Sequence, residues 1–310
     1  MIKRIFGKTG LNVSAIGQGC WNIGNQWGDM TDEQANAIIM TAYENGVNLF
    51  DVADAYGIPY GLSEMRLGKA LKDIRNKVFL VSKMGHWGKR TGQDVPLTTP
   101  DMIRLCGHAS LGRLRTEYID VMLCHDSSIK DPSIYIEGFN SLVSEGSIRE
   151  YGISTNNYNV LKTFYDMSGG KCAVVELDYS IINKQPEVEL FPFCKENNIG
   201  ILAHGPMAMG LLAGKYNKHT KFTDTVRSSW NKGNPGRASF ESNLEKVEKV
   251  RDMLHTNKMP KAAIKYVISN DLNIVAIPGA TSTKQVLSNC KAGESLMDKE
   301  LYSQLKNLEY

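Results

Sequence analysis

Short apolar runs alternate with longer amphipathic segments along almost the whole chain, and this alternation limits the folds open to it. The short runs are rich in Val, Ile and Leu, whereas the longer segments repeat apolar residues at helical spacing. Strands that alternate with helices form a parallel sheet with right-handed crossovers. Eight such strands in 310 residues fit a closed (β/α)8 barrel better than an open sheet.

The elements of this barrel can be placed along the sequence. We expect strands at 14–19, 47–50, 78–81, 118–123, 151–153, 173–177, 200–203 and 273–277. We expect helices at 31–44, 63–71, 99–111, 134–145, 160–164, 187–197, 244–254, 261–269 and, as the last one, 283–290. Thr31 and Gln34 have the spacing of a capping box, and Asn45-Gly46 is a typical helix stop.

Two segments lie outside the alternation. Residues 3–13 predict a β-hairpin that turns at Gly7-Lys8-Thr9-Gly10. Residues 205–240, after the seventh strand, are too long and irregular for an ordinary connection, and we expect a functional loop over the barrel mouth. We find no linker or low-complexity tract, so residues 1–310 are expected to form a single barrel domain.

Composition excludes several classes of function. The formal net charge is only +3, which gives no reason to expect nucleic acid or a membrane surface as partner. No apolar run is long enough to cross a bilayer, and the first residues lack a signal-peptide core. The cysteines show no metal-ligand or redox spacing, so we expect no metal and reduced thiols in a cytoplasmic protein. They are Cys20, Cys106, Cys124, Cys172, Cys194 and Cys290.

Polar residues stand where four consecutive strands end. The second strand ends at Asp51, the third at Lys83, the fourth at His125 and the fifth at Ser154. Each alone has an ordinary explanation, since Asp caps turns, Lys is usually exposed and His is often structural. In a barrel, however, the carboxyl ends of the strands converge on one mouth, where barrel enzymes build their active sites.

This set of side chains suits proton transfer. Tyr56 follows Asp51 by five residues, and its phenol has an ordinary pKa of about 10. We expect the ammonium of Lys83 to lower that pKa and Asp51 to hold Lys83. His125 is expected to position a carbonyl oxygen or to assist the proton transfer. The set contains neither a nucleophile with an adjacent base nor a metal-ligand cluster.

These stretches resemble the signature of the aldo-keto reductase family, and the likeness covers nearly the whole chain. It runs through Phe50-Asp51-Val52-Ala53-Asp54-Ala55-Tyr56-Gly57, Leu62-Ser63-Glu64, Leu67-Gly68, Val81-Ser82-Lys83, Tyr118-Ile119-Asp120, His125, Gly152-Ile153-Ser154, 210–216 and Ile277-Pro278-Gly279-Ala280. The resemblance implies an NAD(P)(H)-dependent oxidoreductase on a (β/α)8 barrel, with Asp51, Tyr56, Lys83 and His125 as catalytic residues. Tyr60 is a second tyrosine nearby, but only Tyr56 is followed by the matching Gly57.

The cofactor positions depart from the family pattern. Thr155 rather than Asn follows Ser154, Glu176 stands where the family usually has Gln, and His204 replaces the usual stacking aromatic ring. Lys284 stands where members that favour NADPH often carry an Arg, and it would bind the 2′-phosphate as a point charge. We expect NADPH, with NADH as the alternative. The cofactor-binding residues implied are Trp21, Asp51, Ser154, Glu176, His204, Gly205, Pro206, Met207, Gly210, Gly279, Thr281, Lys284, Gln285 and Asn289.

The substrate is expected to be a small carbonyl compound. Aromatic rings near the strand ends can stack on the apolar face of a sugar or ring. The polar neighbours Asn22, Asn25, Gln26 and His86 favour a polyol or sugar-like carbonyl compound. The residues proposed for substrate contact are Trp21, Trp27, His86, Trp87 and Trp230, the last as part of a lid.

Two other functions stay open at this level. Lys83 could form a Schiff base in an aldolase, since lysines at barrel mouths can form imines. Alternatively, the chain could bind a nucleotide as a regulatory or interaction protein, as some relatives of this family do. Turnover of a nicotinamide cofactor with carbonyl compounds, followed at 340 nm, separates the reductase from both.

Overall fold

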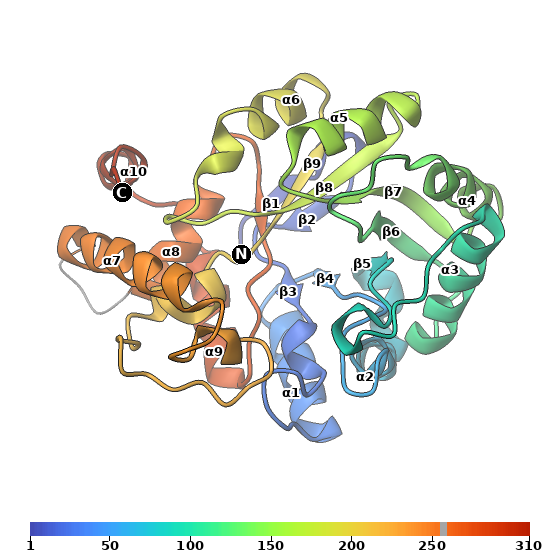
Figure 1. Ribbon diagram of the computed structural model, residues 1–310. Coiled ribbons are helices and arrows are strands. Elements are labelled where there is room, and N and C mark those ends of the chain that lie inside the picture. The colour runs from blue at the N-terminus through green and yellow to red at the C-terminus, as the bar shows by residue number, and fades with distance from the viewer. Residues whose placement is uncertain (255–258) are drawn as a thin grey trace.

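A parallel sheet of eight strands forms the centre of the protein, as the alternation predicts. The computed structural model describes residues 1–254 and 259–310, and Figure 1 shows the strands inside a surround of helices. The strands pair in the order β10-β9-β8-β7-β6-β5-β4-β3, so neighbours in the sheet are neighbours in the chain. They are β3 (Gln18–Gly19), β4 (Leu49–Asp51), β5 (Phe79–Met84), β6 (Ile119–Cys124), β7 (Ile148–Ser154), β8 (Cys172–Asp178), β9 (Gly200–His204) and β10 (Val275–Ala276).

The first and last strands meet and close the ring. Parallel bridges join Ile16 to Ala276 and Gly19 to Gly279. The backbone nitrogen of Gly17 donates to the carbonyl of Ala276 at 2.8 Å, which continues the ladder between the bridges. The expected strand at 14–19 is regular in the sheet only at Gln18–Gly19, because Ser14 ends the hairpin strand β2 (Asn12–Ser14) and Ile16 pairs by an isolated bridge.

The helices follow the strands of the sheet along the chain, one or two after each strand. They are α1 (Asp32–Glu44), α2 (Leu62–Leu71), α3 (Pro100–Leu114), α4 (Ser133–Ser144), α5 (Tyr158–Met167), α6 (Leu190–Glu196), α7 (Arg237–Leu254), α8 (Met259–Ile268), α9 (Thr283–Ala292) and α10 (Lys299–Lys306). The capping box is confirmed, since Thr31 Oγ1 accepts from the Gln34 backbone and the Gln34 side chain accepts from Thr31. Within the described part of the chain, none of these helices is long and apolar enough to cross a membrane.

Two predictions about the last helices were wrong. The expected helix 244–254 begins at Arg237, so part of the segment predicted to be irregular is helical. The helix at 283–290 is not the last, because α10 follows it. Asp298 caps α10 by accepting hydrogen bonds from the backbone nitrogens of Glu300 and Leu301. This N-cap was not recognised in the sequence, because the residues that follow it are mostly polar.

Alternation along the strands gives the barrel interior its layers. Leu49, Val81 and Val174 belong to one buried apolar cluster. Side chains two residues apart on a strand point to the same face. The next inward positions on these strands are therefore Asp51, Lys83 and Glu176, all buried. Three ionisable side chains thus lie above an apolar layer, near the carboxyl ends of the strands.

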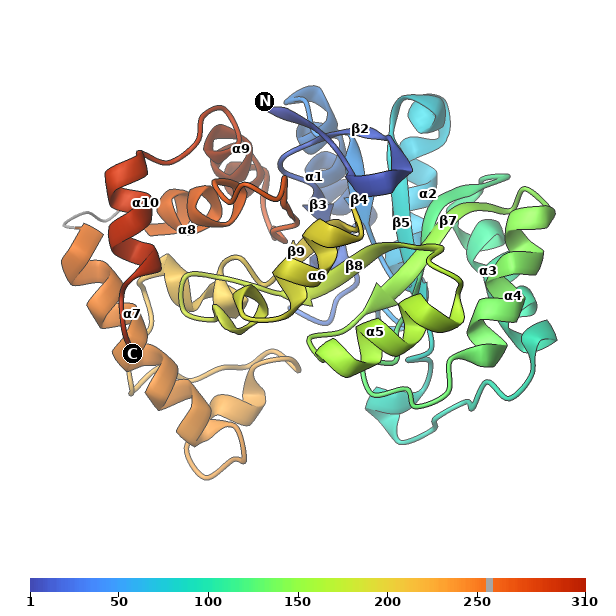
Figure 2. The same cartoon turned by 90° about the horizontal axis from the view of Figure 1, so that it is seen from above.

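The N-terminal hairpin closes the opposite end of the barrel. It consists of β1 (Lys3–Ile5) and β2 (Asn12–Ser14), as predicted, with a short 3-10 turn between them. Phe6 is only 1% exposed and packs against Gly200 at the start of β9. Lys8 donates its backbone nitrogen to Asn198 O at 2.7 Å. Figure 2 shows this hairpin at one end of the strands and α7 at the other.

We expect Phe6→Ala to destabilise the protein by about 3–5 kcal/mol, because the ring fills the base of the barrel and its loss leaves a cavity. Ile5→Ala is the matched control, since Ile5 is 56% exposed and should change stability by less than about 0.5 kcal/mol. Chemical denaturation followed by circular dichroism measures both. Equal effects for the two variants would contradict the role given to Phe6.

Candidate active site

The four residues proposed as catalytic come together at one end of the barrel. Lys83 Nζ lies 2.7 Å from both carboxylate oxygens of Asp51 and donates to the hydroxyl of Tyr56 at 3.4 Å. It also donates to the carbonyl of Val52 at 3.1 Å. The rings of Tyr56 and His125 meet edge to face, with centroids 6.0 Å apart. Residues from three strand ends and one loop therefore form a single group.

Backbone hydrogen bonds between strands explain why Tyr56 reaches Lys83. After β4, the nitrogen of Val52 donates to Val81 O at 2.9 Å and that of Asp54 donates to Lys83 O at 3.0 Å. The chain then turns, and Tyr56 N donates to Ala53 O at 3.1 Å. The loop thus stays attached to β5 until it turns back, which brings the phenol over the ammonium.

Burial sets the protonation of the site. It raises the pKa of Tyr56, and the nearby charge of Lys83 opposes this rise only in part. Lys83 therefore lowers the pKa of Tyr56, as expected, but burial has the larger effect and the net pKa is raised. Burial alone would lower the pKa of Lys83, but the charges of Asp51 and Glu176 raise it well above its usual range. At neutral pH the site therefore contains a neutral phenol beside an ammonium.

Glu176 also belongs to this group, although from the sequence we expected it only to bind the cofactor. It lies on β8, and its Oε2 is 3.1 Å from Lys83 Nζ. Asp51 consequently has a pKa raised by burial first and by the charge of Glu176 second. The signal available in the sequence was spacing, because Val174 and Glu176 stand two residues apart on a strand, as do Val81 and Lys83.

A cavity of about 710 Å³ opens beside this group. Ser154, His204 and His125 line it, as the predicted nicotinamide site requires. Burial lowers the pKa of His204, so its imidazole is neutral at pH 7. The rest of the lining combines polar side chains with two rings, and it consists of Ser127, Thr155, Asn156, Asn157, Asn159, Gln185 and Glu189 together with His86 and Tyr158.

Asn156 does not take the place that the family's asparagine has next to the serine. Its side-chain nitrogen donates to Asp178 O at 3.0 Å, and its side-chain oxygen accepts from Asp178 N at 2.7 Å. The amide is therefore used to bind the end of β8. Ser154 and the carboxyl of Glu176, which are direct partners in the β7–β8 register, are left as the polar groups beside His204.

Three of the proposed substrate residues gather around Tyr56 and His125. Trp21 stacks on Tyr56 with ring centroids 5.6 Å apart, and Trp27 meets Trp21 edge to face at 5.1 Å. His86 stacks on His125 at 4.0 Å. These rings form an aromatic wall next to the phenol.

The other two proposed substrate residues have different surroundings. Trp87 packs against Tyr60, with ring centroids 5.5 Å apart, and under the guanidinium of Arg113. Trp230 is 7% exposed and stacks on Phe240 at 5.3 Å. We therefore correct the assignment of Trp230 to a lid, because its ring is part of the hydrophobic core between the long segment and α7.

Gln26 has a positioning role that the sequence did not indicate. Its Oε1 accepts from Trp21 Nε1 at 2.6 Å and from the Gly57 backbone at 3.0 Å. One buried amide thus links the aromatic wall to the loop that carries Tyr56. Thr225 of the long segment donates to the carbonyl of Gln26 at 2.9 Å, which attaches this segment to the mouth, as its predicted place requires.

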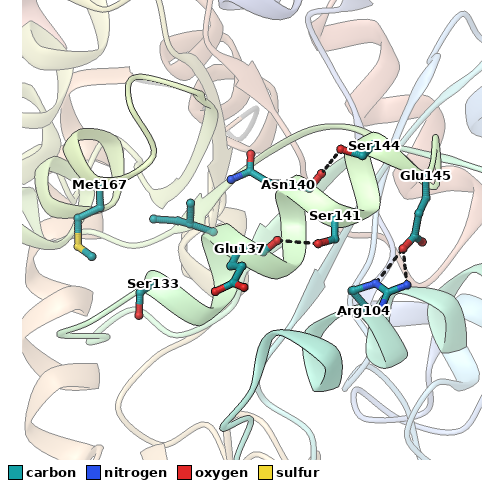
Figure 3. Close-up of a pocket in the computed structure, with 9 residues that line it drawn as sticks. Arg104, Ser133, Glu137, Asn140, Ser141, Ser144, Glu145 and Met167 are labelled. Carbon is teal, nitrogen blue, oxygen red and sulfur yellow. Dashed lines mark hydrogen bonds and ion pairs between the residues drawn. The ribbon is translucent and has the colours of Figure 1, made fainter.

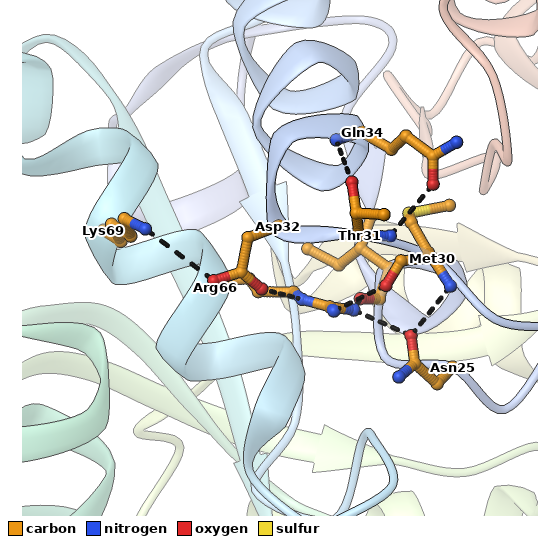
Figure 4. Close-up of polar contacts among 8 residues, drawn as sticks. Asn25, Met30, Thr31, Asp32, Gln34, Arg66 and Lys69 are labelled. Atoms are coloured by element: carbon orange, nitrogen blue, oxygen red, sulfur yellow. Dashed lines mark hydrogen bonds and ion pairs between the residues drawn. The ribbon is translucent and has the colours of Figure 1, made fainter.

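Arg66 holds the same loop from the side of α2. Its guanidinium donates to Ile23 O at 2.6 Å, to Asn25 Oδ1 at 2.9 Å and to Met30 O at 2.7 Å, and it pairs with Asp32 at the start of α1. Figure 4 shows Arg66 at the centre of these contacts. Because Asn25 and Gln26 are used in this way, they are not the polar substrate contacts that the sequence suggested.

The segment from β10 into α9 has the features of a phosphate-binding end. Ser282 caps α9 by accepting a hydrogen bond from the backbone nitrogen of Gln285. The helix is regular over 10 residues, and the free N–H groups at the start of such a helix can bind a phosphate. Gln285 Oε1 accepts from Thr281 N at 2.7 Å, while Lys284 is exposed and Asn289 is buried. Gly279 lies so close to Asn22 that a Cβ there would clash.

The residues after β9 complete the predicted cofactor set. Gly205 has a φ of +67° and lies against the carboxylate of Asp178, where a side chain would not fit. Pro206 and Met207 follow it, and Gly210 has a φ of +93° within an irregular 3-10 turn. His204, which lines the cavity, directly precedes this stretch in the chain. A ligand in the cavity that extends past His204 would therefore meet the backbone that begins at Gly205. The residues present thus fit a dinucleotide.

A second cavity, of about 660 Å³, lies on the outside of the barrel. It is formed mainly by α4, with Arg104 of α3 and Met167 of α5 at its edges (Figure 3). Arg104 and Glu145 form an exposed ion pair there. Among the described residues, no strand end contributes to its lining, whereas His125, Ser154 and His204 at the ends of three strands line the inner cavity, so we place the active site there. In the described part of the chain, no group of His, Cys, Asp and Glu could hold a metal ion.

Comparison with known proteins agrees with this geometry. The chain is 28% identical over 320 residues to an NADH-specific methylglyoxal reductase of Escherichia coli, which covers 94% of this chain and 93% of the relative. The fold matches the aldo-keto reductase AKR11C1 of Bacillus halodurans with a TM-score of 0.78 and 29% identity, over 99% of this chain and 95% of that one. It matches the glycerol dehydrogenase AKR11B4 of Gluconobacter oxydans with a TM-score of 0.77 and 27% identity, over 96% and 91%.

The family model agrees over almost the whole sequence. The model of the aldo/keto reductase family matches residues 15–309, which include every strand of the barrel and all of the active-site residues described above. The chain therefore belongs to the aldo/keto reductase family and is an NAD(P)H-dependent oxidoreductase that interconverts carbonyl compounds and alcohols.

Proposed function

We propose that Tyr56 is the proton donor of this reductase and that the substrate is a small, oxygen-rich aldehyde or ketone. The observation that carries the proposal is the 3.4 Å contact from Lys83 Nζ to the Tyr56 hydroxyl, with Asp51 holding the ammonium at 2.7 Å. A neutral phenol has a proton to give, and a fixed ammonium stabilises the phenolate as it forms. In the reverse direction the same pair accepts the proton of the alcohol.

His125 has a separate part in this proposal. It lines the cavity, and its ring lies against those of both Tyr56 and His86. A histidine in this place can donate a hydrogen bond to the carbonyl oxygen, which orients the carbonyl toward the phenol. Two donors on one oxygen polarise the carbonyl as negative charge develops on it.

The bound cofactor supplies the hydride to the carbonyl carbon. We assign its nicotinamide half to Ser154, Glu176 and His204, because Ser154 and His204 line one cavity and Glu176 is the partner of Ser154 in the β7–β8 register. We assign its adenosine half to the start of α9, where the helix N-terminus and Lys284 favour phosphate. We favour NADPH, because Lys284 offers a charge to a 2′-phosphate. The NADH-specific relative shows that preference varies among similar chains.

The oxygen-rich substrate class rests on the wall of the cavity. Away from Tyr56 this wall carries amide, hydroxyl and carboxylate groups, which suit hydroxyl or carbonyl oxygens of a ligand. The rings of Trp21 and Trp27 give the surroundings of Tyr56 an apolar surface that can stack on a ligand. The names of two similar proteins, a methylglyoxal reductase and a glycerol dehydrogenase, refer to small oxygen-rich compounds. Turnover confined to hydrophobic aromatic aldehydes would overturn this class.

The Schiff-base alternative is disfavoured by the charge on Lys83. An imine forms from a neutral amine, and enzymes that use one lower the pKa of the lysine. Here Asp51 and Glu176 raise the pKa of Lys83 against the effect of burial, so the amine stays protonated. A nucleotide-binding protein without turnover is distinguished by the kinetic experiment below.

We predict that Tyr56→Phe lowers kcat for carbonyl reduction by roughly 10²- to 10⁴-fold, the usual contribution of a general acid. The substitution removes only the hydroxyl, so the dissociation constant of NADPH should stay unchanged. Absorbance at 340 nm measures turnover, and quenching of protein fluorescence measures cofactor binding.

Tyr60→Phe is the matched control for this variant. Tyr60 lies four residues further on, and its buried hydroxyl has no hydrogen-bond partner among the described residues. Its removal should leave kcat near the wild-type value. Near-normal turnover in Tyr56→Phe would rule out Tyr56 as donor, and nucleotide binding by the wild-type protein without turnover of any carbonyl compound would favour the regulatory alternative.

We predict that Lys284→Ala lowers kcat/KM for NADPH roughly fivefold, about 1 kcal/mol for an exposed charge pair, and leaves that for NADH unchanged. Lys291→Ala is the control, since it removes an exposed lysine near the other end of α9. Equal losses with both cofactors, or none with NADPH, would show that Lys284 does not contact the 2′-phosphate.

A further inference from the structure

The ammonium of Lys83 faces more acceptors than it has protons. It carries three N–H bonds, and the atoms around it are both oxygens of Asp51, the carbonyl of Val52, the hydroxyl of Tyr56 and Oε2 of Glu176. Four of these atoms lie in hydrogen-bond geometry and share the three protons, whereas Glu176 Oε2 is 3.1 Å away as an ion-pair partner only. Within the described residues this buried oxygen accepts no hydrogen bond at all.

The charges of the cluster do not balance. The titratable groups that face it from the surrounding strands and loops are Cys20, Asp51, Tyr56, Lys83, Glu176 and His204, and His125 lies further out, against the ring of Tyr56. Burial raises the pKa values of Cys20 and Tyr56 and lowers the pKa of His204, so these three are neutral. Two carboxylates then stand against one ammonium, and all three side chains are at most 4% exposed.

A buried site with an uncompensated negative charge binds a proton. Taking an unbalanced charge out of water is costly, and two carboxylates that share a site do not both ionise near neutral pH. The raised pKa of Asp51, caused by burial and then by Glu176, agrees with this expectation. Both carboxyl groups lie within 3.1 Å of the same ammonium, so a proton bound here lies between two acceptors of one buried cluster.

We propose that Glu176 is a positioning residue of the active site, which shares one proton with Asp51 and with it encloses the ammonium of Lys83. The consequence for catalysis is electrostatic. With the pair singly protonated, the cluster is neutral, Lys83 stays an ammonium and Tyr56 stays a protonated donor. When the pair loses its proton, the extra negative charge lies near Tyr56 and opposes formation of the phenolate. The effect of Glu176 on catalysis rests on the proposed function of Tyr56 as proton donor. The sharing of a proton between Asp51 and Glu176 does not depend on that function.

The first test needs neither cofactor nor substrate. Thermal unfolding of wild type and Glu176→Gln is compared between pH 5 and pH 8. A carboxyl pair whose pKa is raised on folding gives stability that is complete below the unfolded value of about 4 and is lost as pH rises through the folded value. Glu176→Gln removes that loss. The Tm of the variant relative to wild type should therefore rise with pH, by roughly 2 °C per unit.

The second test is kinetic. In wild type, loss of the shared proton leaves an extra negative charge near Tyr56 and lowers the rate, which forms the alkaline limb of the pH profile of kcat/KM for reduction. Glu176→Gln has no such proton to lose, so this limb should move to higher pH by about one unit or more. A residue that only contacts the nicotinamide carboxamide would change the affinity for NADPH and leave this limb in place.

Controls make the outcomes decisive. Glu196→Gln makes the same change on α6, at an exposed position, and should move neither readout. If Glu176→Gln does not fold, Glu176→Met removes the same charge at similar length and is expected to show the same trend in Tm. A Tm difference that is constant with pH overturns the shared proton. A Tm difference that rises with an unmoved alkaline limb overturns the catalytic role, and absence of all turnover in wild type overturns the proposed function alone.

Discussion

A buried ammonium held between two carboxylates is the interaction on which the active site depends. Lys83 is completely buried, and an unpaired charge in that position would unfold the barrel or lose its proton. Asp51 supplies two short contacts and Glu176 a third, so the charge is kept inside the barrel at an acceptable cost. The apolar layer beneath, with Leu49, Val81 and Val174, keeps water away from this cluster. Tyr56 gains its role from contact with that charge.

The surrounding loops serve to hold the phenol and its aromatic wall in place. Gln26 joins Trp21 to the Tyr56 loop, and Arg66 fixes the segment that carries Gln26. The long segment after β9 adds a second attachment, since Arg227 lies over the ring of Trp27 and Thr225 binds the backbone of Gln26. The mouth of the barrel is thus built from three loops that are distant in sequence and share one small set of hydrogen bonds.

Much of this arrangement can be predicted from the sequence, because strand periodicity and strand ends are local properties. The barrel, the hairpin, the capping box at Thr31 and the meeting of Asp51, Lys83 and Tyr56 all follow from spacing, turn residues or resemblance. Properties that depend on the summed environment do not. The net rise in the pKa of Tyr56 is one, because burial outweighs the charge that the sequence places beside it. The packing of Trp230 against Phe240 is another, since sequence cannot tell a lid from a loop core. The use of Asn25 and Gln26 as structural acceptors is a third.

The central claim is that a neutral phenol, paired with a buried ammonium, gives its proton as the carbonyl is reduced. The solvent isotope effect on a single turnover tests it most directly, measured with excess enzyme and a fixed carbonyl substrate at a pH where the rate does not vary. The account predicts a slower reduction in D₂O, which is slowed further when the cofactor also carries deuterium at the transferred position, because proton and hydride move in one step. A rate that is the same in H₂O and D₂O while remaining sensitive to the deuterated cofactor would contradict it.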